Sequence, residues 1–227
     1  MFRNFSPDCC LWSFERVRLG PQCPAVIGLL AVVLSVSPVV VNAQTSSSIA
    51  GVVAGRVMNE QVWNSEYQTE KVGGVQVGGF LNARTSVPWF EMRAEFMWTQ
   101  RGGSVVGDLR GGELIGEART DYLTVAVQPR FAARLGLVEV FATAGPVIDV
   151  VLRNRFSPEL GLGLQEVAQV FGAGVGAGFA ATLPSSFHAE IEARVFEGLG
   201  DAYSGDFVSA KNRSSGLVLR FGRTLSR

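Results

Sequence analysis

The chain has 227 residues, of which 47% are apolar and 18% charged, and its formal net charge at pH 7 is zero. This composition is too apolar for a disordered chain, and the length fits one compact unit. The 18 arginines and two lysines are spread along the chain and form no basic stripe, so we expect no nucleic-acid partner.

The first 43 residues have the features of an export signal. Arg16 and Arg18 precede an apolar stretch over residues 25–41, which ends in the small-residue pattern Val41-Asn42-Ala43. A permanent membrane anchor is the alternative, but a stretch of this length interrupted by Pro38 is short for spanning a bilayer. We predict a cleaved signal peptide over residues 1–43 and a mature domain over residues 44–227.

All three cysteines, Cys9, Cys10 and Cys23, lie in the predicted signal peptide. The mature chain would then have no disulfide, no thiolate nucleophile and no cysteine-bound metal. Because Cys23 precedes the apolar stretch, it is badly placed to become the lipid-modified first residue of a lipoprotein.

The mature chain has a two-residue hydrophobic period, which is typical of strands and not of helices. Apolar and polar side chains alternate most clearly over residues 90–99 and again over residues 187–195. Weaker examples and a first strand give the remaining predicted strands: residues 49–57, 75–84, 122–131, 138–148, 170–180 and 217–221. The total is eight strands, an even number as in bacterial barrels.

The links between these strands alternate between short and long. Short links with Pro or Gly fall at residues 86–88, 134–136 and 183–186, and long polar links fall at 58–71, 101–120, 153–169 and 199–212. This order predicts an all-β fold, an eight-stranded antiparallel up-and-down transmembrane β-barrel with short periplasmic turns and long outer loops. A soluble β-sandwich is the alternative, but it would not place every long loop at one end.

Aromatic residues near both strand ends predict two girdles at the membrane interfaces. The girdle at the short links would contain Trp89, Phe90, Phe131, Phe141, Phe179, Phe187 and Phe221. The girdle at the long links would contain Trp98, Tyr122, Phe171 and Phe196. Core packing in a soluble sheet remains the other explanation for these aromatics.

If the apolar face meets lipid, the opposite face lines a lumen only wide enough for side chains. The charged residues predicted to face inward are Arg84, Glu91, Arg93, Glu95, Arg130, Glu190, Glu192, Arg194 and Arg220. An unpaired buried charge costs several kcal/mol, so we expect these groups to pair. Their predicted role is to fill the lumen, without catalysis.

Two further features invite a functional interpretation. Gly172, Gly174, Gly176 and Gly178 recur every second residue but lack the Lys-Ser/Thr of a nucleotide loop, so we expect them to leave space for facing lumen side chains. A hydrolase built from Ser185 or Ser186 with His188 and Glu190 is conceivable, but no Gly-x-Ser-x-Gly element is present. We predict no enzyme, with no catalytic, cofactor-binding or metal-binding residues, and a structural role for His188, the only histidine.

The mature chain resembles the PorT-like outer-membrane β-barrel family. The segments that carry the resemblance are residues 72–80 (VGGVQVGGF), 92–102 (MRAEFMWTQRG), 122–130 (YLTVAVQPR), 144–146 (AGP), 172–179 (GAGVGAGF) and 189–194 (AEIEAR). These are glycine and hydropathy patterns without a catalytic signature. The resemblance implies a small, signal-bearing barrel, and one type of family member is linked to protein secretion across the outer membrane.

We therefore expect a monomeric protein of the bacterial outer membrane with a structural or interaction role. Its partners would be outer-membrane lipid and a protein bound through long links such as residues 101–120. A transporter or channel for small molecules is the alternative function, and it would require an open route through the charged lumen. An enzyme acting on lipid is a third candidate, and it would need His188 near a serine at membrane depth.

Overall fold

The computed structural model describes residues 48–64, 68–106, 114–156, 165–204 and 209–225. The predicted signal peptide and its cleavage site lie outside these ranges, as do parts of the four long links. Among the described residues, no helix combines the length and the hydropathy needed to cross a membrane.

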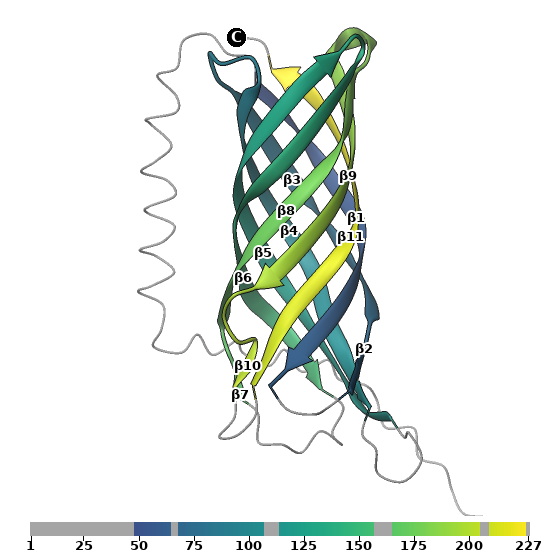
Figure 1. Ribbon diagram of the computed structural model, residues 1–227, viewed down its shortest axis with the longest axis vertical. Coiled ribbons are helices and arrows are strands. Elements are labelled where there is room, and N and C mark those ends of the chain that lie inside the picture. The colour runs from purple at the N-terminus through teal and green to yellow at the C-terminus, as the bar shows by residue number, and fades with distance from the viewer. Residues whose placement is uncertain (1–47, 65–67, 107–113, 157–164, 205–208, 226–227) are drawn as a thin grey trace, which may run out of the picture. The chain divides into compact units, whose positions relative to one another are not determined.

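Eight long strands form the described structure, with three short strands at one end (Figure 1). The long strands are β1 (Ser48–Trp63), β3 (Val72–Arg84), β4 (Phe90–Val106), β5 (Leu114–Leu135), β6 (Val138–Phe156), β8 (Gln169–Thr182), β9 (Phe187–Gly198) and β11 (Ser209–Leu225). The short strands are β2 (Gln68–Glu70), β7 (Gln165–Glu166) and β10 (Tyr203–Ser204). Each long strand pairs antiparallel with the next, and β11 pairs with β1. The predicted closed eight-stranded barrel is confirmed.

The strands are longer than predicted, because the predicted long links contain regular ladders. Residues 101–106 of β4 pair with the start of β5, although residues 101–120 were expected to form a link. In the same way β1 continues to Trp63 and β6 to Phe156. The strand signal is weak here because both faces carry polar residues, whereas backbone hydrogen bonds need no alternation of side chains. The link prediction was wrong for these stretches.

The short links are tight turns, as predicted. Only Gly136 and Leu137 connect β5 to β6, and Gly136 has a φ of 68°, which favours glycine. A 3-10 turn, Pro184–Ser186, connects β8 to β9. Between β3 and β4 the Thr85 hydroxyl donates to the Phe90 carbonyl over 2.8 Å. These turns and the last strand's end lie together at one end of the barrel (Figure 1).

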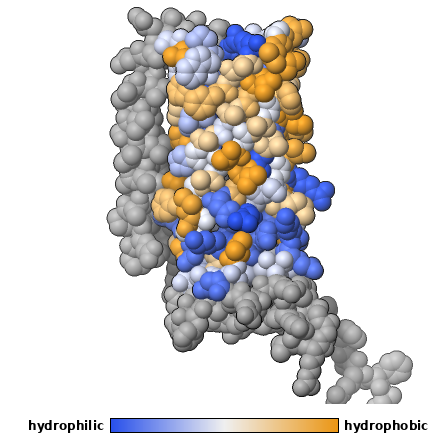
Figure 2. All heavy atoms as spheres, viewed as in Figure 1, coloured by the Kyte–Doolittle hydropathy of each residue, from blue (hydrophilic) through white to orange (hydrophobic). Residues whose placement is uncertain are grey.

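The outer face of the barrel exposes large apolar side chains that a water-soluble protein would bury. Phe96, Val175 and Leu217, on three different strands, are 57%, 59% and 57% exposed. On the face seen in Figure 2, apolar side chains cover the half toward the short turns, and polar side chains gather toward the other end. Such a band of exposed apolar surface is what a lipid bilayer covers.

Aromatic residues form the predicted girdle at the short-turn end but not a comparable one at the other end. Trp89 and Phe131 are exposed and stack with ring centroids 6.0 Å apart, and Phe187 stacks on Phe221 at 5.5 Å. Three residues assigned to the girdles face the lumen and are nearly inaccessible: Tyr122, Phe141 and Phe196. Those three assignments were wrong because they used distance from the strand end instead of the side of the strand.

Candidate functional site: the charged lumen

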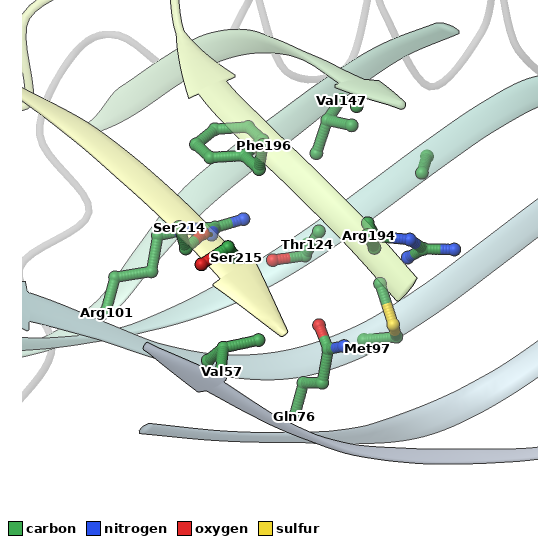
Figure 3. Close-up of a pocket in the computed structure, with 12 residues that line it drawn as sticks. Val57, Gln76, Met97, Arg101, Thr124, Val147, Arg194, Phe196, Ser214 and Ser215 are labelled. Atoms are coloured by element: carbon green, nitrogen blue, oxygen red, sulfur yellow. Dashed lines mark hydrogen bonds between the residues drawn. The ribbon is translucent and has the colours of Figure 1, made fainter. Parts of the chain in front are cut away.

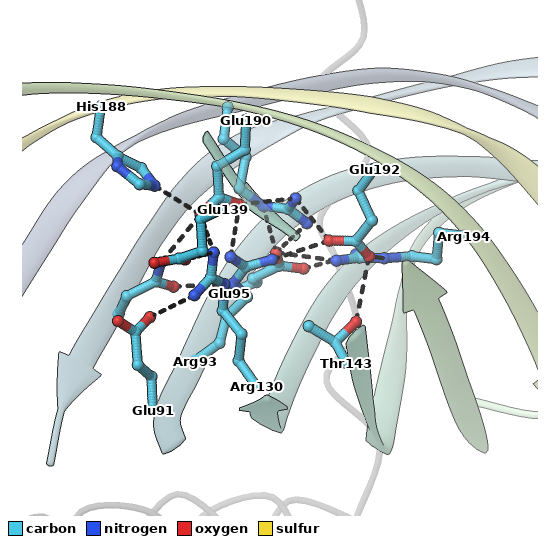
Figure 4. A network of polar contacts seen from close by, with 12 residues as sticks. Glu91, Arg93, Glu95, Arg130, Glu139, Thr143, His188, Glu190, Glu192 and Arg194 are labelled. Carbon is cyan, nitrogen blue, oxygen red and sulfur yellow. Dashed lines mark hydrogen bonds and ion pairs between the residues drawn. The ribbon is translucent and has the colours of Figure 1, made fainter. Parts of the chain in front are cut away.

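A network of arginines and glutamates crosses the lumen (Figure 4), and its positions along the strands place it in the half nearer the short turns. It arises because every second residue of β4 and of β9 points inward, and near the short turns most of these residues are charged. Arg93 on β4 reaches across to β9, with its Nη2 atom 2.5 Å from Glu190 Oε2 and its Nη1 atom 2.8 Å from Glu192 Oε2. Its Nε atom donates to Asn82 Oδ1 over 2.8 Å.

Arg194 and Arg220 extend this network by sharing two carboxylates. Arg194 forms two hydrogen bonds to Glu95, of 2.6 and 3.0 Å, and a third to Glu192 of 2.9 Å. Arg220 lies 2.5 Å from Glu95 and 2.7 Å from Glu192. Paired forks of this kind are the geometry in which arginine holds carboxylates most strongly.

Arg130 carries the network toward the short turns. Its Nη1 atom lies 2.9 Å from Glu91 Oε2, and its Nη2 atom lies 2.5 Å from Glu139 Oε1. Arg84 Nε lies 3.1 Å from the other oxygen of Glu91. The guanidinium carbon of Arg130 also lies 4.2 Å from the centroid of the Phe141 ring. An aromatic face desolvates a guanidinium without removing its attraction to negative charge.

All nine charged residues predicted to face the lumen belong to this network. Glu139 is the one glutamate of this network that the prediction missed, so five glutamates balance five lumen-facing arginines, and the exposed Arg134 lies 3.5 Å from Glu139 at the edge of the network. The side chains of Arg93, Glu192 and Arg220 are 0% exposed. A water-filled pore through this level would leave these side chains accessible, so the network closes the lumen here.

His188 belongs to the same network and does not meet the nearby serines. It is 2% exposed, and its Nε2 atom lies 2.9 Å from Glu190 Oε1, which also accepts a hydrogen bond from Asn82 Nδ2 at 3.2 Å. Ser185 and Ser186 lie in the exposed turn before β9. Among the described residues, no hydrogen bond joins His188 to Ser185 or Ser186.

A second polar layer lies nearer the long links and was missed by the sequence reasoning. Arg101 Nε lies 2.7 Å from Asp149 Oδ2, and Thr124 Oγ1 donates to the other oxygen of Asp149 at 2.5 Å. Arg101 also contacts Ser214 and lies 3.7 Å above the centroid of the Phe196 ring. A signal was present, because Arg101 continues the inward alternation of β4.

A cavity of about 20 Å³ separates the two layers (Figure 3). Among its lining residues are Gln76, Met97, Thr124, Gly174, Arg194 and Phe196. Its volume is sufficient for about one water molecule. Within the described part of the chain, Gln76 Nε2 and both polar side-chain atoms of Gln128 have no hydrogen-bond partner. Buried amides of this kind are normally satisfied by internal water.

The glycines of β8 provide room for this arrangement, as predicted. A Cβ atom added to Gly176 would overlap Glu192 Oε1, and one added to Gly174 would lie 2.8 Å from Gln128 Nε2. Any larger residue at these positions would displace the polar side chains that face β8.

Aromatic side chains pack in the lumen at the long-link end. Trp63, Tyr122 and Tyr203 belong to one buried cluster, in which Tyr122 and Tyr203 are 0% exposed. Tyr203 comes from the short strand β10 and contacts the Thr120 hydroxyl, while Asn212 Nδ2 donates to the Tyr122 hydroxyl at 3.0 Å. The lumen is therefore filled at two levels, by the ion-pair network near the short turns and by this aromatic cluster near the long links.

The closed sheet, the apolar outer face and the filled polar lumen together define a small outer-membrane β-barrel of the bacterial type, with the outer membrane as its location. Solved structures share this fold. The outer membrane protein OprG from Pseudomonas aeruginosa superposes with a TM-score of 0.54 at 10% identity, over 81% of this chain and 98% of that one.

Two further solved structures have lower scores. Neisserial surface protein A gives a TM-score of 0.48 at 11% identity, over 79% of this chain and all of that one. The outer membrane protease OmpT from Escherichia coli gives 0.42 at 10% identity, over 80% and 98% of the two chains. A scan against protein-family models finds no match, and neither does a comparison with curated protein sequences.

Proposed function

We propose that this protein is a non-enzymatic barrel that anchors its long links at the cell surface, where they bind a protein partner. The observation that supports a plugged anchor is the network of five arginines and five glutamates, whose central side chains are fully buried. A charged layer of this kind blocks apolar solutes because each crossing would separate desolvated ion pairs.

We further propose that the chain is exported with cleavage after Ala43 and acts as a monomer, and that it is related to PorT-like barrels. The supports are the charged, apolar and small-residue order of residues 1–43 and the segments of residues 72–80 and 92–102 quoted above.

Measurements of ionic conductance test whether the charged network blocks the lumen. Purified protein inserted in a planar bilayer should add no steady ionic current, and liposomes that contain it should not swell in small sugars. Glu192→Gln removes the ion pairs of Glu192 with Arg93, Arg194 and Arg220, and this variant should give, at most, brief openings. A steady current from the unaltered protein would reject the plugged anchor and favour a channel.

Cross-linking on whole cells tests whether the long links bind a protein partner. A photoreactive amino acid placed at residue 110, in the link between β4 and β5, should form a specific adduct on whole cells. A matched probe at Leu137, in a short turn on the opposite end, should not give the same adduct. Identical adduct patterns from both positions would contradict recognition through the long links.

A transporter for small molecules is the second candidate, and the cavity between the two lumen layers favours it. The unpaired Gln76 amide nitrogen lines this cavity, whose volume of about 20 Å³ holds about one water molecule, so the cavity would have to widen to admit a small polar solute. Uptake would require the Arg93 and Arg220 contacts to open, so the conductance experiment separates the two functions.

A further inference from the structure

An irregularity in β6 places two consecutive side chains on the outer surface of the barrel. Tyr122 of β5 pairs with Val151, but Asp121 pairs with Arg153, so Leu152 has no partner in β5. Leu152 is 55% exposed and Arg153 is also exposed. Bulges commonly redirect side chains in this way, and here a leucine and an arginine point outward together.

Arg153 and Arg155 of β6 lie on the same outer face as Arg119 of the adjacent strand β5. Arg119 and Arg155 are direct neighbours across the ladder between β5 and β6, a position where like charges repel. Arg119 contacts Glu117, and Arg155 Nη2 lies 3.6 Å from Asp121 Oδ2.

The remaining charge of this cluster is positive. Arg153 forms no ion pair with any residue that the structure describes, so three guanidinium groups face only the two carboxylates of Glu117 and Asp121. The outward Arg213 of β11 differs, because Glu197 satisfies it with two hydrogen bonds of 2.6 and 3.0 Å. The cluster on β5 and β6 can therefore accept an anion, whereas Arg213 is already occupied.

The cluster lies where the apolar outer surface ends. Toward the short turns, the outward residues of the same two strands are apolar, including Val125, Ile148 and Val150. Toward the long links they are charged. In bacterial barrels the long links face the cell exterior, so the cluster is at the depth of the outer-leaflet headgroups.

We propose that Arg119, Arg153 and Arg155 bind the phosphate of a phosphorylated glycolipid in the outer leaflet, with Leu152 against its acyl chains. Guanidinium forks match phosphate oxygens in geometry and charge. Basic side chains at the membrane surface attract anionic lipid, and their own aliphatic stems pack on the lipid chains. The site depends on the barrel and its orientation and is independent of whether the lumen conducts.

Lipid titration in detergent tests this site, with lipid A as the diphosphorylated probe. We expect Arg153→Gln and Arg155→Gln each to weaken binding about fivefold, because a basic residue near a membrane surface contributes about that factor. Arg213→Gln is the matched control and should leave binding unchanged. All four proteins should show the same heat-dependent gel shift, since the three altered side chains are exposed.

Two further binding measurements identify the ligand. Chemically dephosphorylated lipid A should bind weakly and equally to the unaltered protein and to Arg153→Gln, and excess inorganic phosphate should not displace lipid A. Equal binding of lipid A by Arg153→Gln, Arg155→Gln and Arg213→Gln would overturn the site. Displacement by inorganic phosphate alone would overturn the lipid as its ligand.

Discussion

Arg93 and Glu192 are 99 residues apart in the sequence, yet the guanidinium Nη1 atom lies 2.8 Å from the carboxylate Oε2 atom. They belong to β4 and β9, which are not neighbours in the sheet, so the ion pair crosses the lumen. Both side chains are 0% exposed. The contact therefore ties opposite walls of the barrel together and occupies the space through which a solute would pass.

Replacing Arg93 with Met should destabilise the barrel strongly. The change removes one guanidinium that Glu190, Glu192 and Asn82 share, while keeping most of the side-chain volume, and breaking a buried ion pair costs about 3 to 5 kcal/mol because it leaves excess negative charge. Urea unfolding of the protein in detergent micelles measures the loss. Arg134→Met is the control, because the Arg134 side chain is 63% exposed and should matter little. Equal midpoints for the two variants would contradict a buried lumen network.

Gly176→Ala should destabilise the protein, although it adds only one methyl group. The new Cβ atom would overlap Glu192 Oε1, and relieving such overpacking costs about 1 to 3 kcal/mol. Gly79→Ala is the matched control in another strand, since its Cβ atom would have Gly51 O as its nearest neighbour at 3.5 Å. Thermal unfolding in the same detergent should rank Gly176→Ala well below Gly79→Ala, and the reverse ranking would refute the packing of β8 against the network.

An arginine placed at Ala94 should be costly because this exposed residue lies within the apolar outer surface. Its ladder neighbours, Leu81 and Val127, are apolar, and a charge near the bilayer midplane costs about 2 to 4 kcal/mol in barrels. Ser104→Arg, near the end of the same strand, should have little effect. Folding yields into lipid vesicles at increasing urea compare the two, and similar yields would mean that Ala94 does not face the membrane core.

Cysteine labelling distinguishes the two faces without altering a charge. Ala94 is exposed on the outer surface, whereas Ala126 is 1% exposed and lines the lumen cavity. A fluorophore on Ala94→Cys should be quenched by a lipid-soluble quencher. Ala126→Cys should react slowly and escape quenching. Labelling of both at the same rate from water would be incompatible with a barrel in lipid.

The fold could be predicted because contact with lipid on one face and side chains on the other imposes a two-residue period on the sequence. Inward charges such as Arg93 and Glu190 were identified for the same reason. That these charges pair was predicted, but the partner of each was not, since it depends on which strands face each other across the closed barrel. Phe141 was assigned to the outer aromatic girdle, although it shares the inward face of β6 with Glu139. Arg101 was assigned to a link, because polar residues on both faces of β4 obscured where the strand ends.

The seam between β1 and β11 has a consequence for how this chain folds. It joins the first and last described strands along the whole of β1, from Ser48 with Leu225 to Trp63 with Ala210. No local segment contains both edges, so the seam has the highest loop-closure cost in the molecule. We expect the sheet to assemble as neighbouring hairpins with two open edges and to close last. Until then, the unpaired edges and apolar outer face expose the chain to aggregation, which makes the time before closure its most vulnerable period.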